Sequence, residues 1–313
     1  MLYHMPAKSS RLYSIALGLS AVELLAVCWL WLGSPPEWFR VNFYSISWWP
    51  FLVMVETWAK IIHGKSLLYD DPKGFLLLCA FSVPFWTAYE ILNTVIKNWI
   101  YIGLPGGDRA ALRWLGYVIA YASVLPAIRV YVDILGIRYP KELPVPDSVH
   151  RPFFSTTAII IGMLLLALCV RHPMTFYPLA WAFSFFFTEP LLIREQSQKS
   201  YLLQWSAGIW LPTAKTLLAG FMAGVTWEFL NWHAQAKWVY TVPSDVILVK
   251  IFEMPVLGFI GFSAFALCAE SFSNLLLTDL KAKKRELWKA GVALGALISV
   301  IGFAMIDTYT WIR

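Results

Sequence analysis

The amino-acid sequence predicts an all-α, polytopic membrane protein with about nine transmembrane helices, arranged as two parallel four-helix repeats plus a C-terminal helix. Three observations predict this fold. Hydrophobic residues make up 59% of the 313 residues and charged residues only 14%, with a mean hydropathy of +0.61, which excludes an ordinary soluble domain. Apolar stretches of spanning length recur along the chain. A polar and aromatic motif in one of these stretches returns in a later one.

The apolar stretches are long enough to cross a bilayer as helices, which takes roughly 17 to 25 residues. The nine predicted spans are residues 13–33, 44–62, 74–96, 112–132, 154–171, 174–193, 208–231, 250–277 and 289–308. Only Arg171, His172 and Pro173 separate the fifth and sixth spans, so these two should form a tight hairpin. The first span is too long for a removed signal peptide and lacks a small-residue cleavage site, so we expect a retained helix.

Lysine and arginine residues gather in the loops on one side of these spans, most densely between residues 281 and 289. By the positive-inside rule, these loops and the N-terminus are cytoplasmic and Arg313 lies outside. We therefore expect a multi-pass protein of the plasma membrane, which in a Gram-negative bacterium is the inner membrane. The net charge of +6 then lies mainly beside anionic lipid headgroups. No zinc-finger spacing or basic-aromatic motif occurs, so nucleic-acid binding is not expected.

The repeated motif has the form aromatic-Glu-x-Leu-Asn, followed by Trp-x-Tyr and a closing Pro. Its copies are residues 89–105, Tyr89-Glu90-Ile91-Leu92-Asn93 with Trp99, Tyr101 and Pro105, and residues 227–243, Trp227-Glu228-Phe229-Leu230-Asn231 with Trp238, Tyr240 and Pro243. Glu and Asn three residues apart share one helical face. Drift among apolar residues does not reproduce Glu-x-Leu-Asn inside a membrane helix. The motif therefore indicates an internal duplication.

The repeat extends beyond this motif. Glu56 and Glu189 are each followed by a Lys-Ser pair in the next cytoplasmic loop, and we expect these carboxyl groups to pair with the Lys-Ser elements. Arg129, Asp133 and Glu270 lie at similar depths and should pair across the halves. Spans one to four then match spans five to eight, with parallel topology and a pseudo-twofold axis along the membrane normal. The predicted units are repeat 1–136, cytoplasmic linker 137–153, repeat 154–280, and basic loop plus ninth helix 281–313.

An ionisable residue inside a span costs about 2.5–3.5 kcal/mol on insertion scales, so such a residue is a functional candidate by default. The candidate acid, base and orienting residues, placed at the outer ends of the helices, are Glu90, Glu228, Asn93, Asn231 and Glu253. The candidate ligand-binding residues are Tyr89, Trp99, Tyr101, Trp227, Trp238, Tyr240, Arg113 and Lys237. The two basic residues are expected either to hold a phosphate or to act as interfacial anchors.

Three interpretations of Glu90 and Glu228 remain open. The first is structural: each carboxyl accepts hydrogen bonds from Trp, Tyr or Asn of the other half and joins the halves. In the second, buried carboxyls act as acid and base, with Asn93 and Asn231 orienting them. In the third, the carboxyls bind a cation or proton in a coupled transporter. A structural or assembly subunit of a membrane complex, with the aromatic belt as a protein interface, is a further class.

The aromatic residues favour a hydrophobic isoprenoid or lipid ligand, because ring faces stabilise developing positive charge. Helix repeats with intramembrane carboxylates are similar in outline to the small polytopic lycopene cyclases and membrane-bound terpene cyclases. The expected partners are therefore membrane lipid, a hydrophobic small molecule or a membrane protein. The four cysteines are isolated and the five histidines give no haem pattern, while metal-dependent prenyltransferase and desaturase motifs do not occur. The sequence requires no metal and identifies no cofactor.

Overall fold

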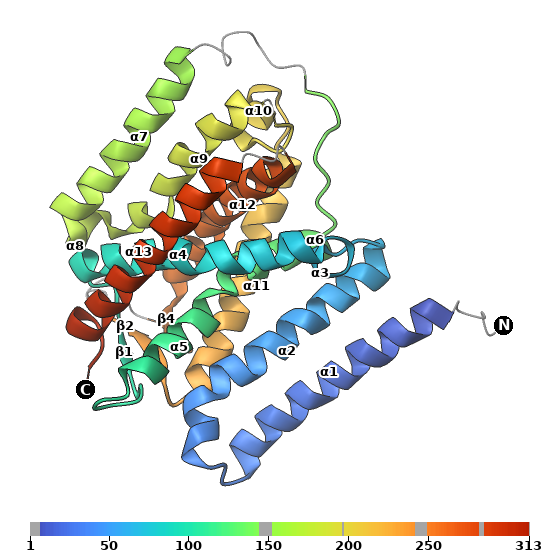
Figure 1. Cartoon of the computed structure of the whole chain (residues 1–313), viewed down its shortest axis with the longest axis vertical. Helices are drawn as coiled ribbons and strands as arrows, with labels where there is room; N and C mark the ends of the chain where they lie inside the picture. The colour runs from blue at the N-terminus through green and yellow to red at the C-terminus, as the bar shows by residue number, and fades with distance from the viewer. Residues whose placement is uncertain (1–6, 144–151, 196, 242–248, 282–284, 313) are drawn as a thin grey trace.

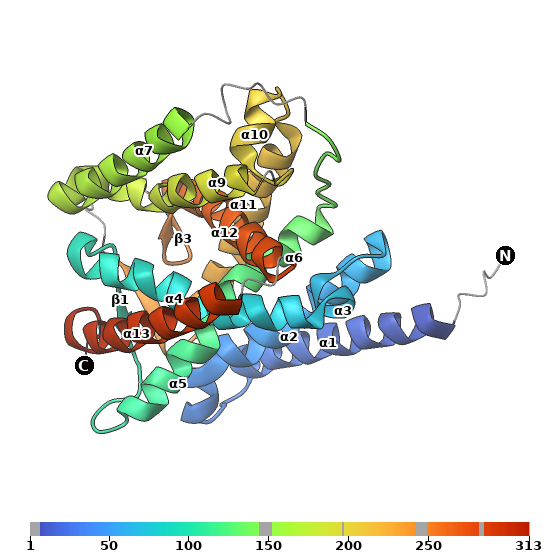
Figure 2. The same cartoon turned by 45° about the horizontal axis from the view of Figure 1, so that its top comes forward.

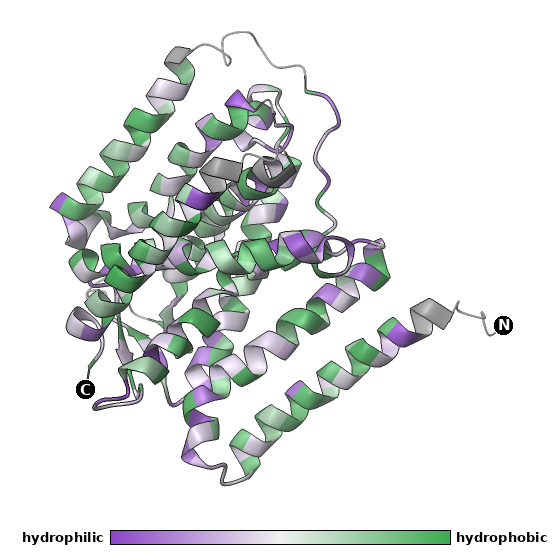
Figure 3. Ribbon diagram, in the orientation of Figure 1, coloured by the Kyte–Doolittle hydropathy of each residue, from purple (hydrophilic) through white to green (hydrophobic). Residues whose placement is uncertain are grey.

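The computed structural model describes residues 7–143, 152–195, 197–241, 249–281 and 285–312, and it is mostly helical. Figure 3 shows that apolar residues dominate most of the helices. Seven segments of the described chain are long and apolar enough to cross a membrane as helices: Arg11–Leu32, Pro72–Ile96, Ala110–Ile134, Phe154–Arg171, Pro173–Arg194, Val256–Thr278 and Lys289–Tyr309. The chain is therefore a multi-pass, helical membrane protein, as the sequence predicts.

The described residues of the first half form six helices. They are α1 (Ala7–Leu32), α2 (Glu37–His63), α3 (Leu67–Asp70), α4 (Pro72–Ile96), α5 (Ala110–Tyr121) and α6 (Val124–Ile134). Gly64 ends α2 in the left-handed conformation with φ of 68° and donates its N–H to the carbonyl of Lys60, a common helix C-terminus. Asp71 begins α4 by accepting the N–H of Gly74 at 3.0 Å, with Pro72 in the first turn, where its missing N–H is not needed.

The second half continues with a similar series of helices. They are α7 (Pro152–Arg171), α8 (Pro173–Phe176), the 3-10 helix η2 (Tyr177–Trp181), α9 (Phe183–Arg194), α10 (Tyr201–Ser206), α11 (Leu211–His233), the 3-10 helix η4 (Val256–Gly258), α12 (Phe259–Lys281) and α13 (Arg285–Tyr309). The tight turn expected after Arg171 is present, since α8 begins at Pro173. Pro243, Lys283 and Lys284 lie outside the described residues.

Three of the predicted spans differ from the structure. The span 250–277 starts too early, because residues 250–258 form two short strands, β3 (Lys250–Ile251) and β4 (Met254–Pro255), followed by η4. The span 112–132 is divided between α5 and α6, and the span 174–193 begins with α8 and η2 before α9. A hydropathy window averages over such breaks. The span 44–62 falls within α2, whereas the span 208–231 begins three residues before α11; neither helix is among the seven apolar segments.

A two-stranded ribbon, absent from the predicted fold, joins the two halves. Strand β1 (Trp99–Ile102) follows α4, strand β2 (Lys237–Tyr240) follows α11, and the strands are antiparallel. Their register pairs Trp99 with Tyr240 and Tyr101 with Trp238. The chain after α13 lies along the other edge of β1, because the N–H of Tyr101 donates to the carbonyl of Thr310 at 2.8 Å. The C-terminus thus closes the sheet edge that β1 would otherwise expose.

The long helices pack around a centre formed by α6, α11 and α12, with α2, α4 and α9 against it. Figures 1 and 2 show α1 at one edge beside α2 and α7 at the opposite edge beside α9. Gly220 permits the close contact of α11 with α12, because a Cβ there would lie 2.3 Å from the carbonyl oxygen of Phe262. Small residues serve this purpose between membrane helices generally.

Candidate functional site

Both asparagines of the repeated motif fasten the strand that follows their helix. The Asn93 Nδ2 donates to the Trp99 carbonyl at 2.8 Å, and its Oδ1 accepts the N–H groups of Asn98 at 2.9 Å and Trp99 at 3.3 Å. The Asn231 Nδ2 donates to the Trp238 carbonyl at 2.9 Å, and its Oδ1 accepts the Trp238 N–H at 3.0 Å. The asparagines therefore position strand backbone, whereas the sequence interpretation had them orienting the neighbouring Glu side chains.

Glu90 is completely buried and accepts hydrogen bonds on both oxygens. Its Oε1 accepts the Trp86 indole N–H at 2.7 Å and the Tyr101 hydroxyl at 2.5 Å, and its Oε2 accepts the Trp99 indole N–H at 3.2 Å. The Tyr121 hydroxyl donates to the Tyr101 hydroxyl at 3.0 Å and extends this chain. Glu90 therefore fixes the orientation of aromatic side chains on α4, β1 and α5.

Glu228 is also completely buried, but only one of its oxygens is engaged. Its Oε1 accepts the Trp238 indole N–H at 3.0 Å and the Tyr240 hydroxyl at 2.7 Å, while Oε2 accepts no hydrogen bond from any residue that the structure describes. Gly224 lies one helical turn before Glu228 in α11. The equivalent position in α4, one turn before Glu90, is Trp86. For both glutamates these donors belong to the same half of the chain, so the expected bonding to the other half is wrong.

Burial raises the pKa of the Tyr101 and Tyr240 hydroxyls well above the usual range, and the nearby glutamates raise it further. Both hydroxyls therefore stay protonated at physiological pH and serve as hydrogen-bond donors. Tyr101 and Tyr240 lie on the two strands of the ribbon, outside the apolar spans.

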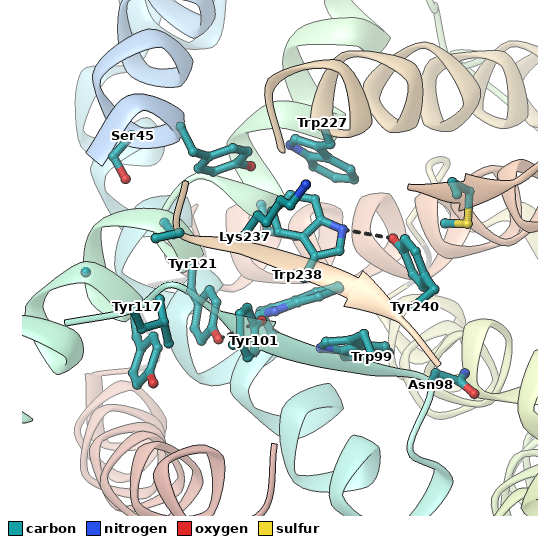
Figure 4. Close-up of a pocket in the computed structure, with 18 of the residues that line it drawn as sticks. Ser45, Asn98, Trp99, Tyr101, Tyr117, Tyr121, Trp227, Lys237, Trp238 and Tyr240 are labelled. Atoms are coloured by element: carbon teal, nitrogen blue, oxygen red, sulfur yellow. Dashed lines mark hydrogen bonds between the residues drawn. The ribbon is translucent and has the colours of Figure 1, made fainter. Parts of the chain in front are cut away.

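A cavity of about 400 Å³ lies over the ribbon. Figure 4 shows Trp99, Tyr101, Trp238 and Tyr240 on the paired strands, with Tyr117 and Tyr121 to one side and Trp227 across from the ribbon. Seven of the predicted ligand-binding residues line this cavity: Trp99, Tyr101, Trp227, Trp238, Tyr240, Arg113 and Lys237. The aromatic lining residues that the sequence analysis did not single out are Tyr44, Trp86, Tyr117, Tyr121, Tyr177, Trp181 and Phe262.

The remaining candidates lie beside the cavity and do not line it. Tyr89 is buried in the helical core, where its hydroxyl shares a hydrogen bond of 2.7 Å with Ser184 and its ring stacks on Trp181. The five candidate acid, base and orienting residues, Glu90, Glu228, Asn93, Asn231 and Glu253, are likewise not among the lining residues. The carboxyl groups of Glu90 and Glu228 sit behind the Trp and Tyr side chains whose polar atoms they bind.

Both basic candidates form ion pairs. Arg113 Nη2 and Nε donate to the two Asp307 oxygens at 2.8 and 3.2 Å, its Nη1 donates to the Pro105 carbonyl at 2.8 Å, and its guanidinium lies 3.9 Å from the Trp311 ring centre. Lys237 pairs with Glu253 at 2.5 Å. Glu253 lies in the turn between β3 and β4, not at the start of a helix. Both charges are therefore paired with a carboxylate of the protein.

Glu56 and Glu189, near the helix ends away from the ribbon, form the pairs that the sequence predicts. Glu56 accepts a hydrogen bond from the Ser66 hydroxyl, and Glu189 accepts one from the Ser200 hydroxyl at 2.6 Å. The serine of each Lys-Ser element is thus the confirmed partner.

The expected pairing across the halves is also confirmed. Arg129 on α6 donates to Glu270 on α12 at 2.8 Å and to Asp133 at 2.9 Å. Among the described residues, no group of three or more His, Cys, Asp or Glu side chains is placed to hold a metal ion.

Comparison with known proteins found no matching family model, no matching curated protein and no matching solved structure. The candidate site is therefore interpreted from its own geometry.

Proposed function

We propose that this chain is an internally duplicated, nine-span protein of the plasma membrane that binds a hydrophobic isoprenoid or lipid ligand in the aromatic cavity. The observation that carries this proposal is the cavity of about 400 Å³, whose lining is mostly apolar and aromatic. Several of its aromatic side chains bind the buried carboxyl groups of Glu90 and Glu228. Ligand sites typically combine a mostly apolar concave surface with a few fixed polar groups. An isoprenoid or acyl chain suits such a lining.

Equivalent contacts in the two halves support the duplication. Each motif Asn binds the strand that follows its helix, and each motif Glu binds the Trp and Tyr of that strand. In the ribbon, the Trp of each copy pairs with the Tyr of the other copy, as a local twofold axis would produce. On the other side of the protein, Glu56 and Glu189 bind equivalent serines. The proposed repeats are 1–136 and 154–280.

Contacts between helix ends support nine crossings. The start of α2 meets the chain after α11, because Gln235 N–H donates to the Arg40 carbonyl at 3.0 Å. At their other ends, His63 of α2 and Lys215 of α11 bind the carbonyls of Ile134 and Leu135 at 2.8 and 3.0 Å. These two helices of 27 and 23 residues therefore run the full distance between two faces of the protein. Each is long enough to cross a bilayer.

An acid/base enzyme such as a membrane isoprenoid cyclase is the second candidate, and one observation favours it. Glu90, Tyr101 and Tyr121 form a hydrogen-bonded chain with links of 2.5 and 3.0 Å that ends at side chains lining the cavity. Such a chain can carry a proton between the buried carboxyl and a ligand. Glu90→Gln and Glu228→Gln would then abolish turnover of an added isoprenoid in a folded protein. Unchanged turnover in both variants would reject the enzyme and leave the binding function.

The binding function is tested by filling the cavity. Gly116 lines the cavity and a Cβ there meets nothing within 4 Å, so Gly116→Phe places a ring in the ligand's space without an initial clash. Gly18 on α1 is a matched control, because it is also helical, is exposed and has nothing within 4 Å. Native mass spectrometry should detect a specific isoprenoid or lipid on the wild type and on Gly18→Phe, and lose it on Gly116→Phe. Equal retention by all three chains would contradict the proposal.

A further inference from the structure

The Oε2 atom of Glu228 is a buried acceptor that the protein leaves unused. The Glu228 side chain is completely buried, and this oxygen accepts no hydrogen bond from the residues that the structure describes. A carboxylate oxygen without a donor in a low-dielectric interior is unfavourable unless something else binds it. In the other half, the Trp99 indole reaches Oε2 of Glu90, and the Trp86 indole supplies a further donor at Oε1. Gly224 occupies the matching position before Glu228, and Phe262 packs against it, so no side chain replaces that indole.

This unused oxygen lies close to the cavity. Its partner atom Oε1 is bound by Trp238 and Tyr240, both of which line the cavity. Tyr44 also lines the cavity, contacts the Trp238 ring edge-on with centroids 5.3 Å apart, and lies near enough to feel the charge of Glu228. A ligand group that enters between these rings therefore approaches the carboxyl of Glu228.

The charges around the cavity favour a cation. The two basic lining residues, Arg113 and Lys237, are neutralised by Asp307 and Glu253. No Lys, Arg or His forms an ion pair with Glu228 among the described residues. Trp and Tyr ring faces attract cations, by about 2 kcal/mol or more where water is excluded. An aromatic cage with a nearby unpaired carboxyl is suited to an organic ammonium group.

We propose that the half of the cavity around Tyr44, Trp227 and Trp238 binds the ammonium group of an amphiphilic ligand, with Glu228 as its counter-charge. This inference rests on the proposed ligand-binding function and specifies the chemical class of the ligand. The apolar chain of that ligand lies along the remaining aromatic lining of the cavity. A lipid headgroup and a soluble alkylamine share this chemistry.

The first test compares three short probes on the wild-type protein in a maltoside detergent, using quenching of tryptophan fluorescence. Hexyltrimethylammonium should bind about thirtyfold more tightly than 1-hexanol, because a desolvated cation–π contact of about 2 kcal/mol corresponds to that factor. Hexanesulfonate should bind most weakly. Equal binding of the cation and the neutral alcohol overturns the ammonium inference while the proposed function stands. Binding of none of the three probes, together with no co-purified lipid, rejects the proposed function itself. This comparison requires no substitution and is independent of variant folding.

The second test uses Glu228→Gln, which keeps the size of the side chain and removes its charge. The preference for hexyltrimethylammonium over 1-hexanol should become smaller, because the rings still attract the cation but its counter-charge is gone. The affinity for 1-hexanol should stay unchanged. Asp70→Asn is the control, because it makes the same chemical change in α3, away from the cavity. Unchanged cation binding in Glu228→Gln overturns the inference. Native mass spectrometry then separates the sources: displacement of a choline or ethanolamine lipid by the probe identifies a headgroup, and displacement of a small amine identifies a soluble ligand.

Discussion

Removing Asp307 should destabilise the protein strongly, although this residue lies near the end of the last helix. Asp307 accepts two hydrogen bonds from Arg113, one from the Trp114 indole at 3.2 Å and one from the Tyr117 hydroxyl at 2.9 Å. The Arg113 side chain is only 5% exposed and the Asp307 side chain 16%. Asp307→Ala therefore leaves a buried guanidinium without its counter-charge.

The expected cost follows from the burial of this pair. Breaking a buried ion pair by removing one partner costs about 3–5 kcal/mol. Because Asp307 is partly exposed, we expect a loss of about 3 kcal/mol in the free energy of unfolding. The Lys60–Asp70 pair is the internal comparison, because its side chains are 24% and 45% exposed. An exposed pair of this kind contributes about 0–1 kcal/mol. For a chain of this size, we expect Asp307→Ala to lower the Tm by about 6 °C and Asp70→Ala by less than about 2 °C.

The assay is thermal unfolding in one detergent, followed by tryptophan fluorescence for the wild type and the two alanine variants. The variant Arg113→Met/Asp307→Leu removes both charges and should recover part of the lost Tm, since no unpaired charge then remains buried. Equal Tm losses in Asp307→Ala and Asp70→Ala would refute the reasoning. So would a double variant that is less stable than Asp307→Ala alone.

Three further predictions follow from contacts elsewhere in the chain. Asn93→Ala should lower the Tm more than Asn231→Ala, because three backbone groups at the start of β1 lose their hydrogen-bond partner in the first variant and two backbone groups of β2 in the second. Each buried group left without a partner costs about 1–3 kcal/mol. Equal Tm losses would contradict this prediction. Cysteines placed at Glu37 and Lys65, near the two ends of α2, should be labelled by an impermeant maleimide from opposite sides of the membrane, and labelling from the same side would reject the nine-span topology. Burial raises the pKa of Asp70, but hydrogen bonds and nearby lysines outweigh this effect and hold the pKa below its usual range. The small Tm advantage of the wild type over Asp70→Asn should therefore disappear as the pH falls below about 4. The advantage should not decrease at higher pH.

The helical framework and the polar pairs near the inner helix ends were predictable from the sequence. Glu56 and Glu189 are predictable because each stands inside an apolar helix, with a serine 10 residues later in one case and 11 in the other. Helix and loop geometry then brings the two groups together. The pairing of Arg129 with Glu270 is predictable because buried charges of opposite sign at the same depth need partners. In these cases the partner follows from spacing, depth and charge alone.

The ribbon was missed because its strands have only four residues each and their Trp-x-Tyr pattern is also typical of membrane interfaces. Its formation depends on hydrogen bonds between segments far apart in the chain, which no local pattern reveals. Asp307 was missed for a related reason. A single carboxyl near the end of the ninth helix resembles an interfacial residue until Arg113, on α5, is placed beside it.

The most direct test of the account is to locate the bound ligand by photo-crosslinking. The protein in nanodiscs is exposed to three diazirine probes: an isoprenoid alcohol, an alkyltrimethylammonium and, as the bulk-lipid control, a phospholipid. After the probes are activated with light, the modified residues are identified by mass spectrometry. Both small probes should modify residues of β1, β2 and the start of α5, and Gly116→Phe should remove these adducts. Adducts confined to the lipid-facing surfaces of α1, α7 and α13, as for the bulk phospholipid, would contradict a ligand-binding cavity.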